Sequence, residues 1–227
     1  MLKTLRALPA RLAMVLLMLT WGGAAAAQPQ IEISGYLGLQ SAADSIVRFS
    51  GHPNQPPGDV LIGWDGRSLQ GAVYYGARIT RWSSRGTGWG WGGDFIHAKA
   101  YADDDSLAGL SFDRLQLTNG HNILTATLFY RWNDGGSRWT PHVGAGLGFT
   151  IPYMISSAEE GQTRGYQFGG PAVMVAVGVS YALNDNWSIF GEYAGTYSAN
   201  RLRFDEGGSM RTNLFTNALN MGLSFRF

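Results

Sequence analysis

The feature that most constrains the fold of this chain is a hydrophobic period of two that recurs in eight segments. In each segment apolar side chains occupy every second position, and Gly, Ser, Thr, Asn or charged residues occupy the positions between. Side chains of a β-strand point alternately to its two faces, so the pattern predicts eight amphipathic strands. The predicted strands lie within residues 31–40, 72–82, 89–105, 121–132, 139–151, 172–181, 187–198 and 215–227.

The connections between these segments alternate between short and long. The short ones are 83–88, 133–138 and 183–186, and the long ones are 41–70, 102–120, 152–169 and 199–211. An even number of strands with short turns at one end and long loops at the other is typical of outer-membrane barrels. In lipid every backbone polar group must be paired within the protein, which for strands requires closure. The sequence therefore predicts an all-β fold, an eight-stranded antiparallel up-and-down transmembrane β-barrel.

The first 27 residues have the character of a secretory signal peptide. A basic start is followed by an apolar run of about ten residues, too short to span a bilayer as a helix. The small residues Ala25, Ala26 and Ala27 then fit a cleavage site. We expect residues 1–27 to be a cleaved signal peptide and residues 28–227 to form the barrel domain. We also expect both ends of the mature chain to lie on the periplasmic side of a bacterial outer membrane.

Aromatic residues gather at the strand ends that face the short turns, where we expect one interfacial girdle. They are Trp82, Trp89, Trp132, Trp139, Tyr181, Trp187 and Phe227. The alternating apolar residues that lead to Phe227 resemble the C-terminal signal read by the outer-membrane insertion machinery. A soluble lipocalin-like barrel is the alternative, but its outward face would be polar and its inward face apolar. The small and polar second face found here favours a polar lumen.

Charged residues fall at inward positions of four predicted strands. Arg78, Asp94, His142 and Glu192 lie four or five residues from the short-turn ends. The interior of an eight-stranded barrel is just wide enough for side chains, and a buried charge needs a partner. We predict a paired ionic network across the lumen, with Arg78 on Asp94 and Glu192 on Arg or His, in preference to a catalytic centre.

The segment 89–105, which contains DFIHAKAYADDD, has no purely apolar face. With Asp94 inward, a regular strand turns His97 and Lys99 outward. Tilted strands climb about 2.5 Å of membrane per residue, which puts His97 near the upper edge of the apolar band and Lys99 among the headgroups. Lys99 is then either a phosphate partner or a simple interfacial anchor. A bulge near Gly92 and Gly93 would instead send both side chains inward.

Other polar residues are expected at the same rim. Asp65 precedes the second strand, and Asn119 and His121 begin the fourth. Two histidines with Asp65 would suit a divalent metal, although no tight ligand spacing supports this. Turn formation is the alternative for Asp65 and Asn119, since each precedes a glycine. Asp103, Asp104 and Asp105 are expected in a solvated loop, and His52 in an unremarkable proline-rich loop.

Several segments resemble the lipid A oxidase family, small outer-membrane barrels that form 2-aminogluconate from the proximal glucosamine of lipid A. They are GWDGRS, YYGARITRW, DFIHAKAYAD, NILTATLFYRW, PHVGAGLG and FGEYAGTYSAN. The resemblance implies dioxygen as co-substrate and a divalent cation. The candidate residues for such chemistry are His97 as acid, base or ligand, Lys99 on phosphate, and His121, Asn119 and Asp65 in support.

Two functions from different classes remain open. The first is an oxidoreductase that modifies lipid A in lipopolysaccharide at the outer leaflet. The alternative is a non-enzymatic barrel of the OmpA or OmpX kind, serving adhesion or envelope integrity; a wide pore is disfavoured by eight strands. The full chain has a formal net charge of +1, and its first 27 residues hold three basic and no acidic residues, so the mature chain carries −2. This balance disfavours nucleic-acid binding, and we expect a monomer.

Overall fold

The computed structural model describes residues 30–71, 73–83, 88–132, 136–158 and 161–227. The predicted signal peptide lies outside these residues. Within them, no helix is long and apolar enough to cross a membrane.

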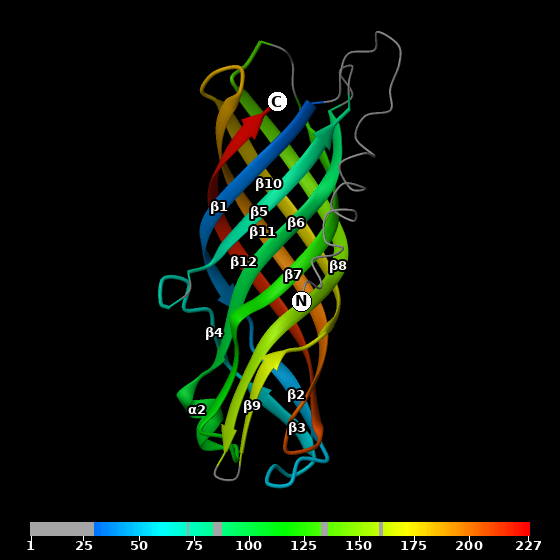
Figure 1. Cartoon of the computed structure of the whole chain (residues 1–227). Coiled ribbons are helices and arrows are strands. Elements are labelled where there is room, and N and C mark those ends of the chain that lie inside the picture. Colours follow the sequence, from blue (N-terminus) through cyan, green and yellow to red (C-terminus); the bar gives the residue numbers. More distant parts are fainter. Residues whose placement is uncertain (1–29, 72, 84–87, 133–135, 159–160) are drawn as a thin grey trace, which may run out of the picture.

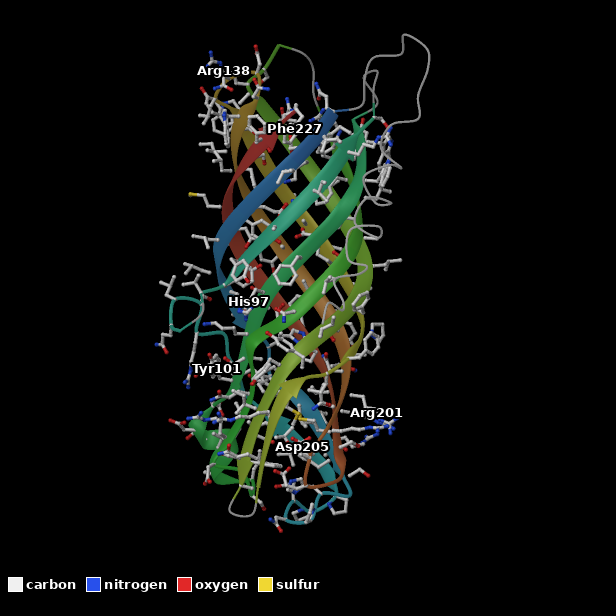
Figure 2. All side chains as sticks on the ribbon, in the orientation of Figure 1. His97, Tyr101, Arg138, Arg201, Asp205 and Phe227 are labelled. Carbon is white, nitrogen blue, oxygen red and sulfur yellow. The ribbon has the colours of Figure 1, made fainter. Side chains whose placement is uncertain are left out.

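Eight antiparallel strands close into a ring, as the sequence predicts (Figure 1). The ring order is β1, β5, β6, β7, β8, β10, β11, β12, and pairing of β1 with β12 closes it. The strands are β1 (Gln30–Ala42), β5 (Tyr75–Trp82), β6 (Trp89–Ala102), β7 (Arg114–Arg131), β8 (Trp139–Ala158), β10 (Gly170–Ala182), β11 (Trp187–Arg203) and β12 (Ser209–Arg226). We call the end with the short connections and Phe227 the turn end, and the opposite end the loop end (Figures 1 and 2).

Near the turn end the outer face of the ring is apolar, and the inner face combines polar side chains with a buried cluster of aromatic and aliphatic ones. On β12, Leu219 and Met221 are 65% and 77% exposed, while Asn220 between them is 5% exposed. Trp89, Trp132, Trp139, Trp187 and Phe227 are exposed at the turn end, where the girdle was expected. The prediction that Trp82 belongs to this girdle is wrong. It is 6% exposed inside the barrel, because it shares the inward face of β5 with Arg78 and Thr80.

The strands continue well past the length that a membrane requires. Strands β7, β8, β11 and β12 hold 18, 20, 17 and 18 residues, whereas about 9–11 tilted residues cross a bilayer. Toward the loop end the two faces exchange character. On β11, Tyr197 is outward and Thr196 inward, but beyond them Arg201 is outward and Leu202 is fully buried inward.

The long connections are therefore not plain loops. They contain β2 (Ser45–Ser50), β3 (Gly58–Ile62), β4 (Trp64–Asp65), β9 (Gly161–Tyr166) and the helix α2 (Asp104–Ala108). These elements and the adjoining ends of β7, β8, β11 and β12 form what we call the cap. The acidic run expected in a solvated loop begins this helix, since Asp103 is its N-cap and accepts a hydrogen bond from the backbone N–H of Ser106 at 2.8 Å.

The cap has a hydrophobic core of its own, separate from the side chains inside the barrel. The rings of Phe49, Phe112 and Phe204 lie 5.3–6.3 Å apart at its centre. The His52 ring contacts Phe112 and Phe204 with centroids 4.9 and 4.7 Å away. His52, expected in an unremarkable loop, is 8% exposed and part of this core.

Candidate functional site

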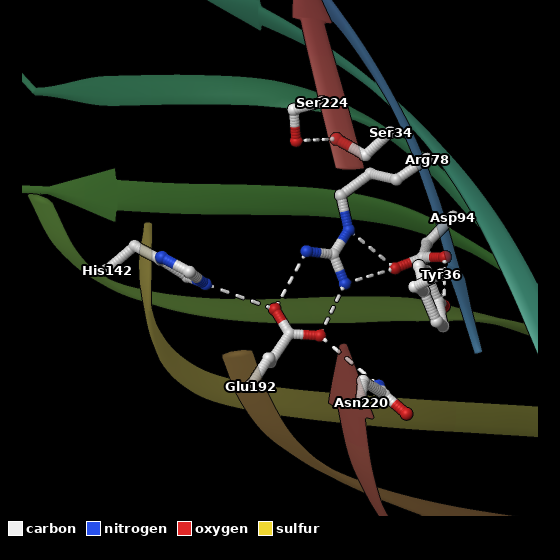
Figure 3. Close-up of polar contacts among 8 residues, drawn as sticks. All are labelled: Ser34, Tyr36, Arg78, Asp94, His142, Glu192, Asn220 and Ser224. Atoms are coloured by element: carbon white, nitrogen blue, oxygen red, sulfur yellow. Dashed lines mark hydrogen bonds and ion pairs between the residues drawn. The ribbon is translucent and has the colours of Figure 1, made fainter. Parts of the chain in front are cut away.

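A network of charges fills the barrel interior, as the sequence predicts (Figure 3). Arg78 contacts Asp94 on the neighbouring strand at 2.6 Å and Glu192 across the lumen at 2.8 Å. Tyr36 donates to the second oxygen of Asp94 at 2.7 Å, and Nε2 of His142 lies 3.2 Å from Glu192. The pocket open at the turn end reaches Arg78 and His142. These contacts cross the lumen, and each carboxylate has more than one partner.

Strand β6 turns His97 and Lys99 to the outer face. Its ladders with β5 and β7 are regular from Trp89 to Ala98, and the register shifts only between Ala98 and Ala100. Because no bulge interrupts the strand at Gly92 and Gly93, Asp94, Ile96 and Ala98 point inward. The residues between them therefore point outward.

His97 is held by its neighbours on both adjoining strands. Its ring stacks on Tyr75 of β5 at 4.8 Å, and its Nδ1 lies 2.9 Å from Oδ1 of Asn122 on β7. The amide nitrogen of Asn122 donates to the carbonyl of Ile151 at 3.2 Å, so Oδ1 is left to accept from Nδ1–H. This assigns the imidazole lone pair to Nε2. His97 is 6% exposed, and no described residue lies within hydrogen-bond distance of Nε2.

Gly120 allows this close arrangement. Its φ is +108°, and a Cβ placed there would lie 2.1 Å from Oδ1 of Asn122 and 2.6 Å from Nδ1 of His97. The glycine lies where the β7–β8 register shifts, between Leu117 and His121. The irregular backbone thus gives room to the His97–Asn122 pair.

The prediction that Lys99 lies among the headgroups is wrong. It is fully buried, and its ammonium donates to the carbonyls of Arg67 and Gln70, which hold the segment 66–71 against the barrel. The accessible cation is Arg67, which pairs with Asp65 at 3.3 Å and lies over the ring of Tyr101 at 4.8 Å. Asp65 is therefore an exposed ion-pair partner at the rim.

The other predicted site residues do not join His97. His121 points inward, is fully buried and lies 3.0 Å from the hydroxyl of Ser198. His97 and His121 are thus on opposite faces of the wall. The side chain of Asn119 lies outside the described part of the chain. In that part no group of three or more His, Cys, Asp or Glu side chains could hold a metal ion, so His97, His121 and Asp65 do not form the metal site considered from sequence.

A seam lies beside this site, between β1 and β6. Strand β5 begins at Tyr75, opposite Leu37, so the loop-end part of β1 has no β5 neighbour. The Gln40 side chain fills the gap: its Oε1 accepts from the Lys99 N–H at 2.9 Å and its Nε2 donates to the Lys99 carbonyl at 3.0 Å. Ser68 pairs in the same manner with the N–H and carbonyl of Gln40. Two side chains thus replace the missing strand.

Comparisons with known proteins agree with this barrel. The family model described as outer membrane protein beta-barrel domain matches residues 12–227. The chain belongs to this family. Comparison with curated protein sequences gives no match.

Solved barrels of this kind cover most of the chain at low sequence identity. A major outer membrane protein of Thermus thermophilus has 12% identity and a TM-score of 0.51, covering 88% of this chain and 100% of that one. Neisserial surface protein A has 17% identity and a TM-score of 0.46, covering 87% and 97%. The attachment invasion locus protein of Yersinia pestis, solved with a heparin analogue, has 15% identity and a TM-score of 0.44, covering 88% and 99%. These likenesses concern the fold.

In this outer-membrane barrel, sequence reasoning located His97 but missed what orients it. Alternation alone predicts Tyr75 on the outward face of its strand, but it does not identify Tyr75 or Asn122 as partners of His97. The pairing of Arg78 with Asp94, which was predicted, also fixes the register that places Tyr75 opposite His97. That signal was available from the sequence. The contact of Lys99 with the carbonyls of segment 66–71 had no such signal, because it depends on the path of a loop.

Proposed function

We propose that this protein acts at the outer leaflet of the outer membrane, through the outer face of its wall. In this orientation the turn end and both ends of the mature chain lie in the periplasm, and the cap lies outside the cell. The Arg78–Glu192 pair crosses the interior of an eight-stranded barrel, which is just wide enough for side chains, and this supports a role outside the lumen.

The reaction that we propose is oxidation of the proximal glucosamine of lipid A to 2-aminogluconate. One observation supports chemistry at this place: His97 lies on the outward face with Nδ1 fixed by Asn122, and its Nε2 is buried without a hydrogen-bond partner among the described residues. A neutral imidazole oriented in this way can accept a proton from a substrate hydroxyl once the side chains that cover Nε2 move aside. The choice of lipid A rests on the family resemblance. Dioxygen would take two electrons and two protons from the free anomeric hydroxyl and its carbon and leave as hydrogen peroxide, and water would open the resulting lactone, so that the product gains one oxygen atom.

The metal implied by the resemblance does not fit the described residues as a complete site. His97 offers one nitrogen donor, and among the described residues it belongs to no group of three or more His, Cys, Asp or Glu side chains that could hold a metal ion. We therefore assign no step to a metal. The groups that the protein itself would bring to the reaction are the oriented imidazole of His97 and the exposed guanidinium of Arg67.

Mass spectrometry of lipid A from a host that lacks the activity tests this proposal. Expression of the wild-type chain should add one oxygen atom to lipid A in aerated, metal-replete cells. His97→Gln should abolish the product, whereas His121→Gln, on the inward face of the adjacent strand, should retain it at equal barrel abundance. Unchanged lipid A with well-folded wild-type protein would refute the oxidation.

A second function is favoured by the cap. Its aromatic core gives the exposed end a defined shape, which suits adhesion or envelope integrity without catalysis. This function predicts that His97→Gln leaves the phenotype of the cells intact. Phe204→Ala, which opens the cap core, should remove it. The opposite result for both variants would refute the non-enzymatic role.

A further inference from the structure

Three arginines stand in one row on the outer face of the loop-end half. In the strand ladders Arg201 of β11 is directly opposite Arg211 of β12, and Arg211 is directly opposite Arg48 of β2. Asp59 of β3 ends the row opposite Arg48. All four side chains are exposed, and Figure 2 shows Arg201 on the outer surface.

The row carries more positive charge than its neighbours neutralise. Arg48 donates two hydrogen bonds of 2.6 Å to Asp59, and these hold the pKa of Asp59 below its usual value. In the described chain, Arg201 and Arg211 have no carboxylate within ion-pair distance. Directly opposed residues on antiparallel strands lie about 5 Å apart, where like charges destabilise the sheet. Two adjacent guanidinium groups thus lack an anion.

The surface on the membrane side of the row is mainly apolar, with the exposed Asn213 as a polar residue between Arg211 and Phe215. Tyr197 and Phe215 are directly opposed on β11 and β12, four residues nearer the turn end than Arg201 and Arg211. Ile46 and Leu61 are directly opposed on β2 and β3 and are 60% and 64% exposed. The arginines therefore lie at the upper border of an apolar surface.

The height of the row agrees with the headgroup layer. Arg201 follows Trp187 of the turn-end girdle by fourteen residues on the same strand. A tilted strand climbs about 2.5 Å per residue, so Arg201 lies about 35 Å above Trp187, beyond an apolar band about 25 Å tall. An amphipathic lipid seated here places its acyl chains on the apolar surface and its phosphates at the arginines.

We propose that Arg201 and Arg211 bind a phosphate group of lipid A from lipopolysaccharide in the outer leaflet. Guanidinium groups match phosphate geometry with paired hydrogen bonds, and a shared phosphate removes the repulsion across the ladder. This site is distinct from the His97 site, because β11 and β6 lie four places apart in the ring of eight. It does not depend on the proposed oxidation.

Binding of labelled lipid A to the full mature chain in detergent micelles tests the proposal. The variant Arg201→Gln/Arg211→Gln should bind bisphosphorylated lipid A at least about tenfold more weakly than wild type, since hydrogen bonds to charged groups contribute about 1.5–3 kcal/mol and 1.4 kcal/mol is tenfold. The control Arg81→Gln/Arg138→Gln removes the same charge near the turn end. It should bind within about twofold of wild type, because affinity here depends on the site and not on net charge.

Two further measurements separate the sources of the effect. Dephosphorylated lipid A should bind wild type and variant alike, and inorganic phosphate at equal concentration should not displace lipid A. Without lipid A, the thermal midpoint of the double variant should equal or exceed that of wild type, because the opposed charges are gone. Equal affinity of wild type and variant for bisphosphorylated lipid A, or full displacement by inorganic phosphate, would overturn the proposal.

Discussion

The guanidinium of Arg78 on β5 donates two hydrogen bonds, of 2.8 and 2.9 Å, to the carboxylate of Glu192 on β11. The same guanidinium contacts Asp94, so one cation serves two buried carboxylates (Figure 3). Glu192 gains a further contact from His142, and Asp94 gains one from Tyr36. The network joins strands from different sides of the ring, and removal of its cation leaves two buried anions opposed.

Arg78→Met should lower the free energy of unfolding by about 3–5 kcal/mol, which is the cost of breaking a buried ion pair. Urea unfolding in lipid vesicles measures this. Arg81→Met is the matched control, because Arg81 lies on the same strand but points outward over Trp91 at 5.8 Å. Its loss should stay below about 1 kcal/mol. Equal losses for the two variants would show that the network does not stabilise the barrel.

Gln40→Leu should loosen the seam between β1 and β6. The leucine has a similar volume but cannot bond the N–H and carbonyl of Lys99, and an orphaned buried group costs about 1–3 kcal/mol. Hydrogen exchange should show faster exchange of the Lys99 amide, together with a lower unfolding midpoint. Ser41→Ala, at the exposed neighbouring position, should change neither. Unchanged exchange at Lys99 in Gln40→Leu would contradict this account.

The ring of eight strands could be predicted from the sequence. Lipid outside the barrel and polar packing inside it require side chains of different character at alternate positions of each strand. The same rule explains where prediction stopped. Beyond Asn200 of β11 the outward residues Arg201 and Arg203 are charged and the inward residue Leu202 is apolar, since water replaces lipid. The predicted strand ended where the chemistry of its faces exchanged, although the backbone geometry continues. Strands that run into a second core therefore look like loops.

The predictions for two individual residues were wrong for different reasons. Trp82 was assigned to the girdle from its type, but the period of two places it inside, where Arg131 lies over its ring at 4.0 Å. Lys99 was assigned to headgroups from its height and face, both of which the strand supports. Its burial comes from segment 66–71, whose path no local pattern specifies. Alternation predicts to which face of a strand a side chain points. Whether a loop then covers that side chain can be seen only in the folded structure.

Lys99→Met should release segment 66–71 from the wall. Methionine retains the length of the side chain but cannot donate to the carbonyls of Arg67 and Gln70, so the stability should fall by about 1–3 kcal/mol. Limited proteolysis should then cut within this segment faster than in wild type. Asp65→Asn removes only the exposed ion pair with Arg67 and should cost less than about 1 kcal/mol. Proteolysis at the wild-type rate in Lys99→Met would show that Lys99 does not hold segment 66–71 against the barrel.

The cap should weaken in acid because of His52. Its Nδ1 accepts from the backbone N–H groups of Asn54 and Gln55 at 3.2 and 3.1 Å, which requires the unprotonated ring. Burial lowers the pKa of His52 below 6.5, and the charge of Glu206 opposes this only in part. For a histidine with a lowered folded pKa, the stabilisation is complete above the unfolded value and is lost as the pH falls through the folded value.

Hydrogen exchange in the cap at pH 7.5 and at pH 5 measures this loss. Amides of β2 and of the segment after it should exchange faster at pH 5, after correction for the intrinsic rate. Amides of β10, which lies outside the cap, should not change. In His52→Leu the neutral side chain keeps the contacts with Phe112 and Phe204 but cannot titrate, so the difference between the two pH values should vanish. A cap that loosens equally in wild type and His52→Leu would assign the acid sensitivity to another group.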